Sequence, residues 1–224
     1  MLTLVLTDAE LELIPEKIQN HPSVLKHARR RGKKPSEILL DSTYHHSAIR
    51  VLDEWERRGR PDIVHISLLT ALESILNREG LLRVYIHTRN DLVISVNPKT
   101  RLPRNYNRFV GLMEKLLLEG RVPPERPLLK VEKFGFQGLL KRLNGGTYFV
   151  AHEKGEAITP PKLGKLLVSS SKPVVFVGAF PHGDYIHEPP GRRISIYSSP
   201  LMAWTVVGEL VYSYELWLLW GVME

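Results

Sequence analysis

The sequence predicts an α/β protein with a largely parallel sheet and helices on both faces of that sheet. Short apolar runs, such as Val174–Val177, alternate along the chain with longer stretches of helical apolar spacing, such as Phe109–Leu117. This alternation is typical of parallel strands joined by crossover helices. The 224 residues are 43% hydrophobic, which is enough apolar material for one well-packed domain.

The first half of the chain is expected to begin with a strand and then to alternate between short elements. In chain order these are a strand at Leu2–Leu6, a helical start at Pro15–Gln19, a strand end at Glu37–Leu40, a helix at Ala48–Arg57, a strand or the entry to a helix at Ile63–Ile66, and a helix at Ser67–Leu76. A strand pair follows at Leu82–His87 and Leu92–Val96, because Arg89-Asn90-Asp91 has turn chemistry.

The second half is expected to begin with an amphipathic helix that contains Phe109 and ends before Gly120. The elements predicted after it are a strand at Thr147–Ala151, a helix at Pro161–Leu167, strands at Val174–Val177 and Ile194–Tyr197, and a helix at Leu201–Trp220.

The stretch Leu201–Met223 is apolar and long enough to raise the question of a membrane span. Glu209 and Glu215 lie inside it, and charged residues inside a span are costly. A buried interface helix is therefore favoured over a membrane span. The N-terminus lacks the basic start and the small-residue cleavage site of a signal peptide.

The charge of the chain favours a polyanionic partner. Its formal net charge is +7 and its sequence pI is about 9.6, and a basic surplus of this size usually indicates nucleic acid. The basic stretch Lys26–Lys34 is either a solvated loop or a phosphate-contacting arm. There are no cysteines, which excludes disulfides, thiolate metal sites and cysteine nucleophiles and fits a reducing cytosol.

Several common catalytic patterns are absent from the sequence. It contains no GxxxxGK[ST] phosphate loop, no GxGxxG after a strand, no GxSxG elbow and no HExxH metal motif. His45 and His46 are adjacent, so their side chains point in different directions and a shared metal is not expected. A classical Rossmann nucleotide site and a metal site are therefore both disfavoured.

Two strand-end loops in the last third of the chain predict a ligand pocket. The strand Val174–Val177 leads into Gly178–Gly183, and the strand Ile194–Tyr197 leads into Ser198–Leu201. Ligands of open α/β sheets bind at the carboxyl ends of the strands, and glycines there let the backbone approach a ligand closely. Taken alone, either loop is more often only a turn.

A second cluster, in the middle of the chain, is rich in arginine. Arg60 stands beside Asp62, while Arg101, Arg104 and Arg108 precede the helix around Phe109. Arginine binds phosphate through two parallel hydrogen bonds, and an aromatic residue can stack on an unpaired base. Together with the basic total, this favours RNA binding over a merely solubilising surface.

At this point several motifs resemble those of the nucleolar essential protein family, archaeal type. These proteins are pseudouridine-N1-specific methyltransferases of small-subunit ribosomal RNA, and they belong to the SPOUT class. The resemblance covers nearly the whole chain. The motifs that carry it are Asp41–His46, Arg60–His65, Val84–Thr88, Arg101–Arg104 and Arg108–Met113.

The resemblance implies one SPOUT-like domain over residues 1–224, with family-specific insertions in the N-terminal half and a C-terminal trefoil knot. It implies S-adenosylmethionine as cofactor, a homodimer formed through the Leu201–Trp220 helix, and a cytoplasmic protein acting in ribosome biogenesis. The implied cofactor contacts are Ala151, Gly178, Gly183, Ile196, Tyr197, Ser198, Ser199, Pro200 and Leu201. The implied RNA contacts are Arg60, Arg101, Arg104 and Arg108.

Arg60 and Asp62 are the residues expected at the chemistry. A sulfonium methyl donor needs no metal, so catalysis depends mainly on aligning donor and acceptor. Asp62 is either the base that takes the proton of the ring nitrogen or the carboxylate that orients Arg60. The orienting role is favoured, because a carboxylate paired with arginine is a poor base. Two alternatives stay open: a related enzyme acting on tRNA, and a ribosome-assembly RNA-binding factor with dispensable catalysis.

Overall fold

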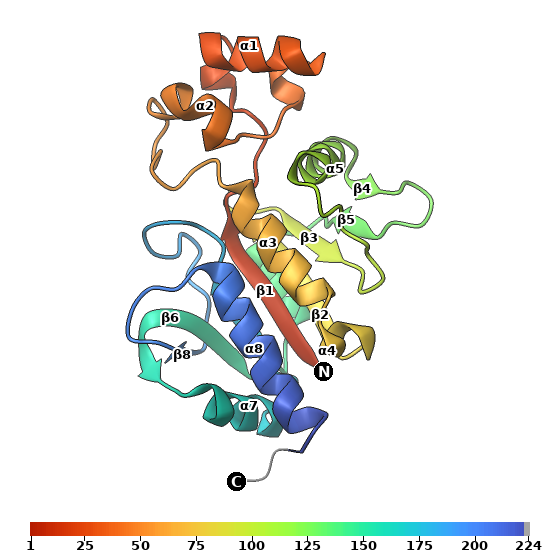
Figure 1. Ribbon diagram of the computed structural model, residues 1–224, viewed down its shortest axis with the longest axis vertical. Helices are drawn as coiled ribbons and strands as arrows, with labels where there is room; N and C mark the ends of the chain where they lie inside the picture. Colours follow the sequence, from red (N-terminus) through yellow and green to blue (C-terminus); the bar gives the residue numbers. More distant parts are fainter. Residues whose placement is uncertain (222–224) are drawn as a thin grey trace.

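A single eight-stranded sheet runs through the computed structural model, which describes residues 1–221 (Figure 1). The strand order is β4-β5-β3-β2-β1-β7-β6-β8. The five strands from β2 to β8 in this order pair in parallel, whereas β3, β5 and β4 pair antiparallel. The strands are β1 (Leu2–Ala9), β2 (Leu82–Thr88), β3 (Val93–Val96), β4 (Arg121–Val122), β5 (Leu129–Val131), β6 (Tyr148–Ala157), β7 (Val174–Gly178) and β8 (Arg192–Ser195).

Helices cover both faces of this sheet. All eight residues of β1 are buried, and successive side chains alternate between the faces: Leu4 and Leu6 join a core with α3, α5, α7 and α8, whereas Val5 joins a core with α6. The helices are α1 (Pro22–Arg31), α2 (Ser42–Ile49), α3 (Pro61–Leu72), α4 (Ile75–Arg78), α5 (Tyr106–Glu119), α6 (Phe136–Arg142), α7 (Pro160–Ser169) and α8 (Ala203–Leu218), with 3-10 turns η1 (Glu16–Ile18) and η2 (Pro35–Glu37).

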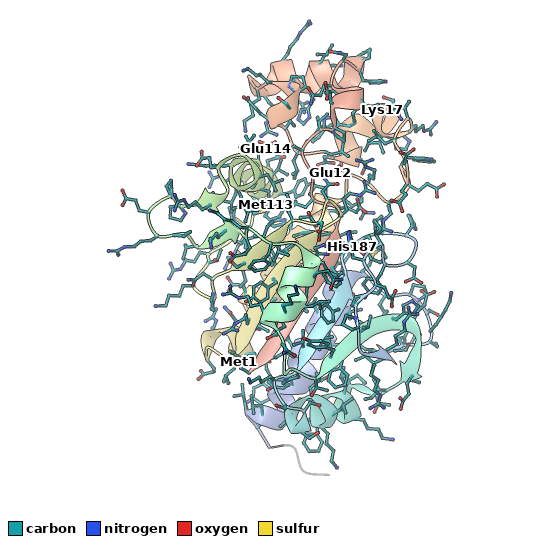
Figure 2. All side chains as sticks on the ribbon, turned by 180° about the vertical axis from the view of Figure 1, so that it is seen from behind. Met1, Glu12, Lys17, Met113, Glu114 and His187 are labelled. Carbon is teal, nitrogen blue, oxygen red and sulfur yellow. The ribbon has the colours of Figure 1, made fainter. Side chains whose placement is uncertain are left out.

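The α1–α2 part stands above one end of the sheet and has a small apolar core of its own (Figure 1). Buried carboxylates join it to the rest. Glu114 of α5 accepts bonds from Arg31 and Lys33 at 2.8 and 2.6 Å, and Glu12 accepts two bonds from Arg58. Figure 2 labels Glu12 and Glu114, and both lie at this junction.

The basic stretch Lys26–Lys34 is mostly helix, so the prediction of a loop was wrong, while a phosphate-contacting role for this stretch stays a prediction. It forms the second half of α1, which ends at Gly32 in the left-handed conformation. Three arginines in the last turn favour a helix, because cations stabilise the negative end of its dipole. Two of the basic side chains, Arg31 and Lys33, are held by Glu114.

Helix boundaries between residues 41 and 78 also differ from prediction. The prediction of a helix at Ala48–Arg57 was wrong, because residues 50–57 form turns and bends. The helix here is α2, which begins at Ser42 because Asp41 accepts a bond from the Thr43 N–H. It ends at Ile49, and Glu54 has a left-handed φ of 51°, which a helix does not tolerate. Ile63–Ile66 lies within α3, and the expected Ser67–Leu76 helix is divided by Ser74, which caps α4.

Other predicted elements are confirmed with modified ends. The strand pair is present as β2 and β3, and the amphipathic helix as α5. The last predicted strand is shifted: β8 covers Arg192–Ser195, so Ile196 and Tyr197 lie in the loop beyond it. Three short elements, β4, β5 and α6, were not predicted. Glu37–Leu40 forms no sheet strand, although Leu39 makes an isolated bridge with Leu13.

The C-terminal helix is shorter than the apolar stretch that predicted it. Within residues 1–221, none of the helices combines the length and the apolar character that crossing a membrane requires. Val222 and Met223, the end of the stretch Leu201–Met223, lie outside the described residues. One face of α8 is buried against α3 and α7.

Candidate functional site

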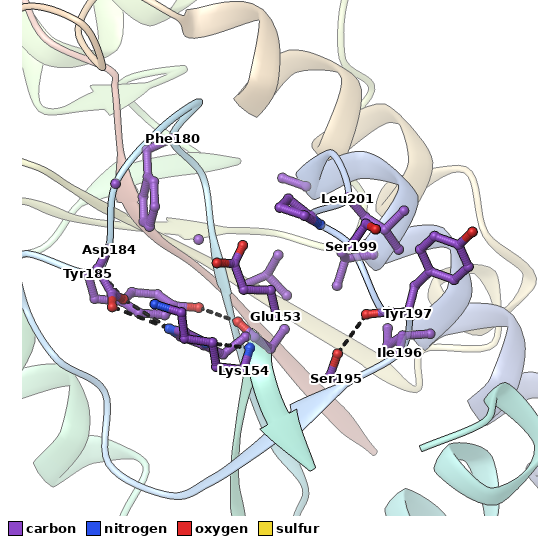
Figure 3. Close-up of a pocket in the computed structure, with 18 of the residues that line it drawn as sticks. Glu153, Lys154, Phe180, Asp184, Tyr185, Ser195, Ile196, Tyr197, Ser199 and Leu201 are labelled. Atoms are coloured by element: carbon purple, nitrogen blue, oxygen red, sulfur yellow. Dashed lines mark hydrogen bonds and ion pairs between the residues drawn. The ribbon is translucent and has the colours of Figure 1, made fainter. Parts of the chain in front are cut away.

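A cavity of about 580 Å³ opens where β6, β7 and β8 end and α8 begins. This size is ordinary for a site that holds a small organic ligand. Figure 3 shows its two walls: one is the loop with Phe180, Asp184 and Tyr185, and the other is the loop with Ser195–Leu201. The cavity therefore lies at the carboxyl ends of parallel strands, where the sequence predicted it.

Most of the cofactor residues predicted from the sequence come together here. Eight of the nine line the cavity: Ala151, Gly178, Gly183, Ile196, Tyr197, Ser199, Pro200 and Leu201. Ser198 belongs to the same loop but is not among the lining residues. The two loops come from different strands, and their pairing across one cavity is a property of the sheet order β7-β6-β8.

An irregularity in β6 supplies the polar floor of the cavity. Ile194 of β8 pairs first with Ala151 and again with Glu156, so residues 152–155 bulge out of the ladder. His152, Glu153 and Lys154 are thereby turned to the cavity. Gly155 permits the bulge, because a Cβ there would lie 2.6 Å from the Ile194 backbone. Bulges of this kind often re-aim side chains next to active sites.

The cavity loop of residues 179–191 is fastened to distant parts of the chain. Buried Asp8, at the end of β1, accepts bonds from the N–H groups of Ile186 and His187 at 2.7 and 3.1 Å. Arg57 donates to the Asp184 carbonyl at 2.8 Å, and its guanidinium lies 4.2 Å from the centre of the Phe180 ring. These contacts hold the wall in place before any ligand arrives.

Hydrogen bonds and burial shift the pKa values of two groups in the wall, Asp184 and Tyr185. The backbone N–H of Tyr185 holds the pKa of Asp184 below its usual range, and His152 adds to this effect. His152 accepts a bond from the Lys154 N–H at its Nδ1, so its Nε2 carries the hydrogen and donates to Asp184 at 3.2 Å. Burial raises the pKa of Tyr185, whose hydroxyl donates to the Ala151 carbonyl at 2.9 Å. The cavity thus offers an ionised carboxylate.

The start of α8 also faces the cavity. Met202 is the residue before the helix, and it provides no side-chain bond to the first N–H groups. Ala203 and Val206 of the first turn line the cavity. Free N–H groups and the positive end of a helix dipole favour a negatively charged or electron-rich ligand group.

Arg60 and Asp62 lie outside this cavity. They form a pair with two parallel bonds of 2.9 and 2.8 Å at the start of α3. The bond to Asp62 raises the pKa of Arg60. Both side chains are about one-third exposed. Neither residue lines the cavity. Asp62 is therefore paired with Arg60 and has no contact with the cavity.

The other predicted RNA contacts flank the start of α5. Arg101, Arg104 and Arg108 are exposed. Within residues 1–221, none of their guanidinium groups makes a hydrogen bond or an ion pair. Next to them, the Tyr106 hydroxyl donates to Asp41 at 2.6 Å, and burial together with this bond raises the pKa of Tyr106. Tyr106 is therefore a structural link and not a free stacking surface.

Several residues of the cavity wall were not expected from the sequence. His152, Glu153 and Lys154 were overlooked because the strand pattern was followed only to Ala151, where polar residues begin. Phe180 lies inside the expected loop Gly178–Gly183 and Asp184 directly follows it, so their nearness to that loop was the available signal. No signal in the sequence indicated Asp8 or Arg57.

The fold and the cavity define a class of protein: an α/β enzyme that holds a small ligand between two strand-end loops at the carboxyl edge of its sheet. The comparisons narrow this class. A family model described as EMG1/NEP1 methyltransferase matches residues 4–215, and the chain belongs to this family.

Close relatives agree over nearly the full length. The chain is 56% identical over 219 residues to the "Ribosomal RNA small subunit methyltransferase Nep1" of Thermococcus onnurineus, covering 98% of this chain and 100% of that protein. The protein of the same name from Pyrococcus furiosus is 56% identical over 223 residues, with 100% and 98% covered. The crystal structure of Archaeoglobus fulgidus Nep1 bound to S-adenosylhomocysteine superposes with a TM-score of 0.86 at 40% identity, covering 95% of this chain and 96% of that one.

Proposed function

We propose that this methyltransferase transfers a methyl group from S-adenosylmethionine to N1 of a pseudouridine in small-subunit ribosomal RNA, during ribosome biogenesis. The observation that carries the proposal is the cavity between the loops 178–185 and 195–201. A structural relative binds S-adenosylhomocysteine, the demethylated product of this cofactor, and relatives of 56% identity act on small-subunit ribosomal RNA according to their names.

The residues of the cavity fit this cofactor. Ile194, Ile196 and Leu201 form an apolar wall that suits an adenine ring. Asp184 is ionised and suits the positive charges of the amino acid part and the sulfonium. Lys154 and the start of α8 suit its carboxylate. When bound, S-adenosylmethionine supplies a methyl group on a positively charged sulphur.

The residues of the chain align the methyl donor with the N1 atom of the target base. The reaction forms a bond between N1 and the methyl carbon, breaks the bond from that carbon to sulphur so that S-adenosylhomocysteine leaves, and passes the N1 proton to solvent water. Walls fixed by Asp8 and Arg57 hold the donor in one place, which lowers the entropic cost of reaching the in-line geometry. The target base must leave its stack to reach the cavity. Because the donor carries its own positive charge, this transfer needs no metal.

In this proposal Asp62 orients Arg60, and Arg60 contacts RNA. Asp62 is held in a pair with two parallel bonds, and a paired carboxylate is a weak base. Arg101, Arg104 and Arg108 have no protein partner among residues 1–221 and present free donors for phosphate. These four arginines are the proposed RNA contacts.

The proposal includes the architecture of the family. We propose one SPOUT-like domain over residues 1–224, with insertions in the N-terminal half and a C-terminal trefoil knot. The resemblance of the motifs and the parallel order β7-β6-β8 support this architecture. A homodimer is supported by Met202, Tyr212 and Trp220, which are large apolar side chains on or beside α8 and more than half exposed. The cytoplasm is the proposed location, because the resemblance is to the archaeal type of the family, whose cells keep ribosomal RNA in the cytoplasm.

The test is methyl transfer from labelled S-adenosylmethionine to two small-subunit rRNA hairpins that differ only in carrying uridine or pseudouridine in the loop. We expect transfer to the pseudouridine hairpin alone. Equal transfer to both would refute N1 specificity, and transfer only to tRNA would favour the tRNA alternative. Cofactor binding without transfer to any of these RNAs would favour a ribosome-assembly factor.

A further inference from the structure

A cluster of one carboxylate and two imidazoles lies behind the cavity wall and has no part in the proposed reaction. Asp8 is the residue before the last of β1, His87 lies in β2, and His187 belongs to the cavity loop. The side chains of Asp8 and His87 are fully buried, and that of His187 is 28% exposed. The Asp8 Oδ1 atom lies 2.7 Å from His187 Nδ1 and 3.6 Å from His87 Nδ1.

The backbone at Asp8 is strained in a way that aims its carboxylate at this cluster. Asp8 has a left-handed φ of 51°, which is uncommon outside glycine, and the β1–β2 register breaks between Leu6 and Ala9. Its Oδ2 atom is fixed by the N–H groups of Ile186 and His187. Its Oδ1 atom is therefore left to face the two imidazoles. Strain that the surroundings hold in place often marks a site with a function.

His87 directs a nitrogen lone pair toward the Asp8 carboxylate. Its Nε2 lies 3.1 Å from Asp91 Oδ1, so Nε2 carries the hydrogen and donates to that carboxylate. Nδ1 is then an acceptor, and its one partner is a long bond of 3.5 Å from the Asp8 N–H. A buried lone pair thus faces a carboxylate oxygen at 3.6 Å, an arrangement of two acceptors that a cation between them would stabilise.

The separations suit a tetrahedral ion. Zinc bonds to nitrogen and oxygen of about 2.1 Å place neighbouring ligand atoms about 3.4 Å apart, and the observed 2.7 and 3.6 Å bracket that value. The three ligand atoms all lie within 4.8 Å of one another. The bond from His87 to Asp91 is the carboxylate–histidine contact that usually orients a metal-bound imidazole.

We propose that Asp8, His87 and His187 bind one zinc-type divalent cation that fastens the cavity loop to the ends of β1 and β2. Two nitrogens and one oxygen are typical ligands for zinc, with water in the fourth position. The ion replaces the hydrogen between His187 and Asp8, and the neutral imidazole of His187 then carries its hydrogen on Nε2. Its role is structural, because the cluster lines no part of the cavity.

The test is cobalt binding by the untagged full chain after treatment with a chelator. Cobalt(II) takes zinc sites and gives visible absorption bands when its coordination is tetrahedral. We expect one equivalent of cobalt to bind and zinc to displace it. His187→Gln is expected to weaken binding at least about tenfold, while His46→Gln, which removes an exposed imidazole outside the cluster, leaves it unchanged.

Three outcomes would overturn the proposal: no tetrahedral cobalt bands, binding that His187→Gln leaves intact, or loss of binding in His46→Gln. His187 lies on a loop and is partly exposed, so its variant is expected to fold, and circular dichroism checks this. The readout is independent of methyl transfer. A failed cobalt titration would therefore leave the proposed reaction untouched, and a failed methylation assay would leave the metal site untouched.

Discussion

Gly178 is the position where a single side chain should close the cofactor cavity. It ends β7, and a Cβ built there would lie 2.8 Å from two ring carbons of Phe180. Comfortable contact between carbons begins at about 3.5 Å, so the ring must move by roughly 0.7 Å. Arg57, 4.2 Å from the ring centre, and Tyr185, at 5.5 Å in an edge contact, restrain that movement.

Gly178→Val therefore forces either the ring or the new methyl groups toward the cavity. Overpacking of a well-packed site costs about 1–3 kcal/mol. If this free energy is lost from ligand binding, the affinity falls roughly 5- to 150-fold, since about 1.4 kcal/mol corresponds to tenfold. Calorimetry with S-adenosylhomocysteine measures the loss directly, and thermal unfolding reports how much of the cost falls on the fold.

The matched control is Gly111→Ala, on α5 and with no atom within 4 Å of the new Cβ. It should raise stability by about 0.5–1 kcal/mol, because alanine favours a helix interior, and leave cofactor affinity unchanged. If Gly178→Val bound S-adenosylhomocysteine within twofold of the original chain, the placement of the cofactor beside Gly178 would be refuted.

Three further predictions address RNA, assembly and pH. Arg104→Ala should weaken rRNA binding, lower the slope of log affinity against log salt concentration by about 0.7, and leave cofactor affinity unchanged. The control Lys162→Ala removes an exposed charge from α7 and should change neither RNA affinity nor that slope. An unchanged slope in Arg104→Ala would mean that the arginine cluster is only a solvated surface. Sedimentation at micromolar concentration should find a dimer, because α8 leaves apolar side chains exposed, and a monomer would contradict the proposed interface. Burial lowers the pKa of His45 from 6.5 to about 4, so its contribution to stability is fully present above pH 6.5 and is lost as the pH falls toward 4, by up to about 3 kcal/mol. Urea unfolding across that pH range measures this loss of stability. The pH-dependent loss should be smaller in His45→Gln and unchanged in His46→Gln. A free energy of unfolding that does not change between pH 6.5 and 4 would contradict a buried, neutral His45.

Much of the cavity could be predicted from the sequence, because its two loops are contiguous and follow strongly apolar strands. Eight of the nine expected cofactor residues line it. The polar floor could not be predicted, since it depends on a bulge that appears only when β6 pairs with β8. His152 and Glu153 follow a strand pattern that stops at Ala151, and nothing local shows that the strand continues to Ala157.

Helices in the first half of the chain were predicted less well than the elements around the cavity. The first half of the chain contains helices whose limits are set by single side-chain bonds, such as Asp41 to the Thr43 N–H and Ser74 to the Asn77 N–H. The basic stretch Lys26–Lys34 became helical because its charges suit a helix end and because Glu114 accepts two of them. Glu114 is 83 residues away from Arg31 in sequence, so periodicity carries no trace of the contact.

The sequence alone determined the alternating α/β character, the position of the two loops that line the cavity, and the family, because each depends on short contiguous motifs and on apolar periodicity. The tertiary structure decided how those loops are held. Asp8 and His187 are 179 residues apart, and Arg57 is 127 residues from Asp184. Such pairs meet only because the sheet places β1 beside β7 and β2, so the residues that fix the wall of the cavity became visible only once the strand order was known.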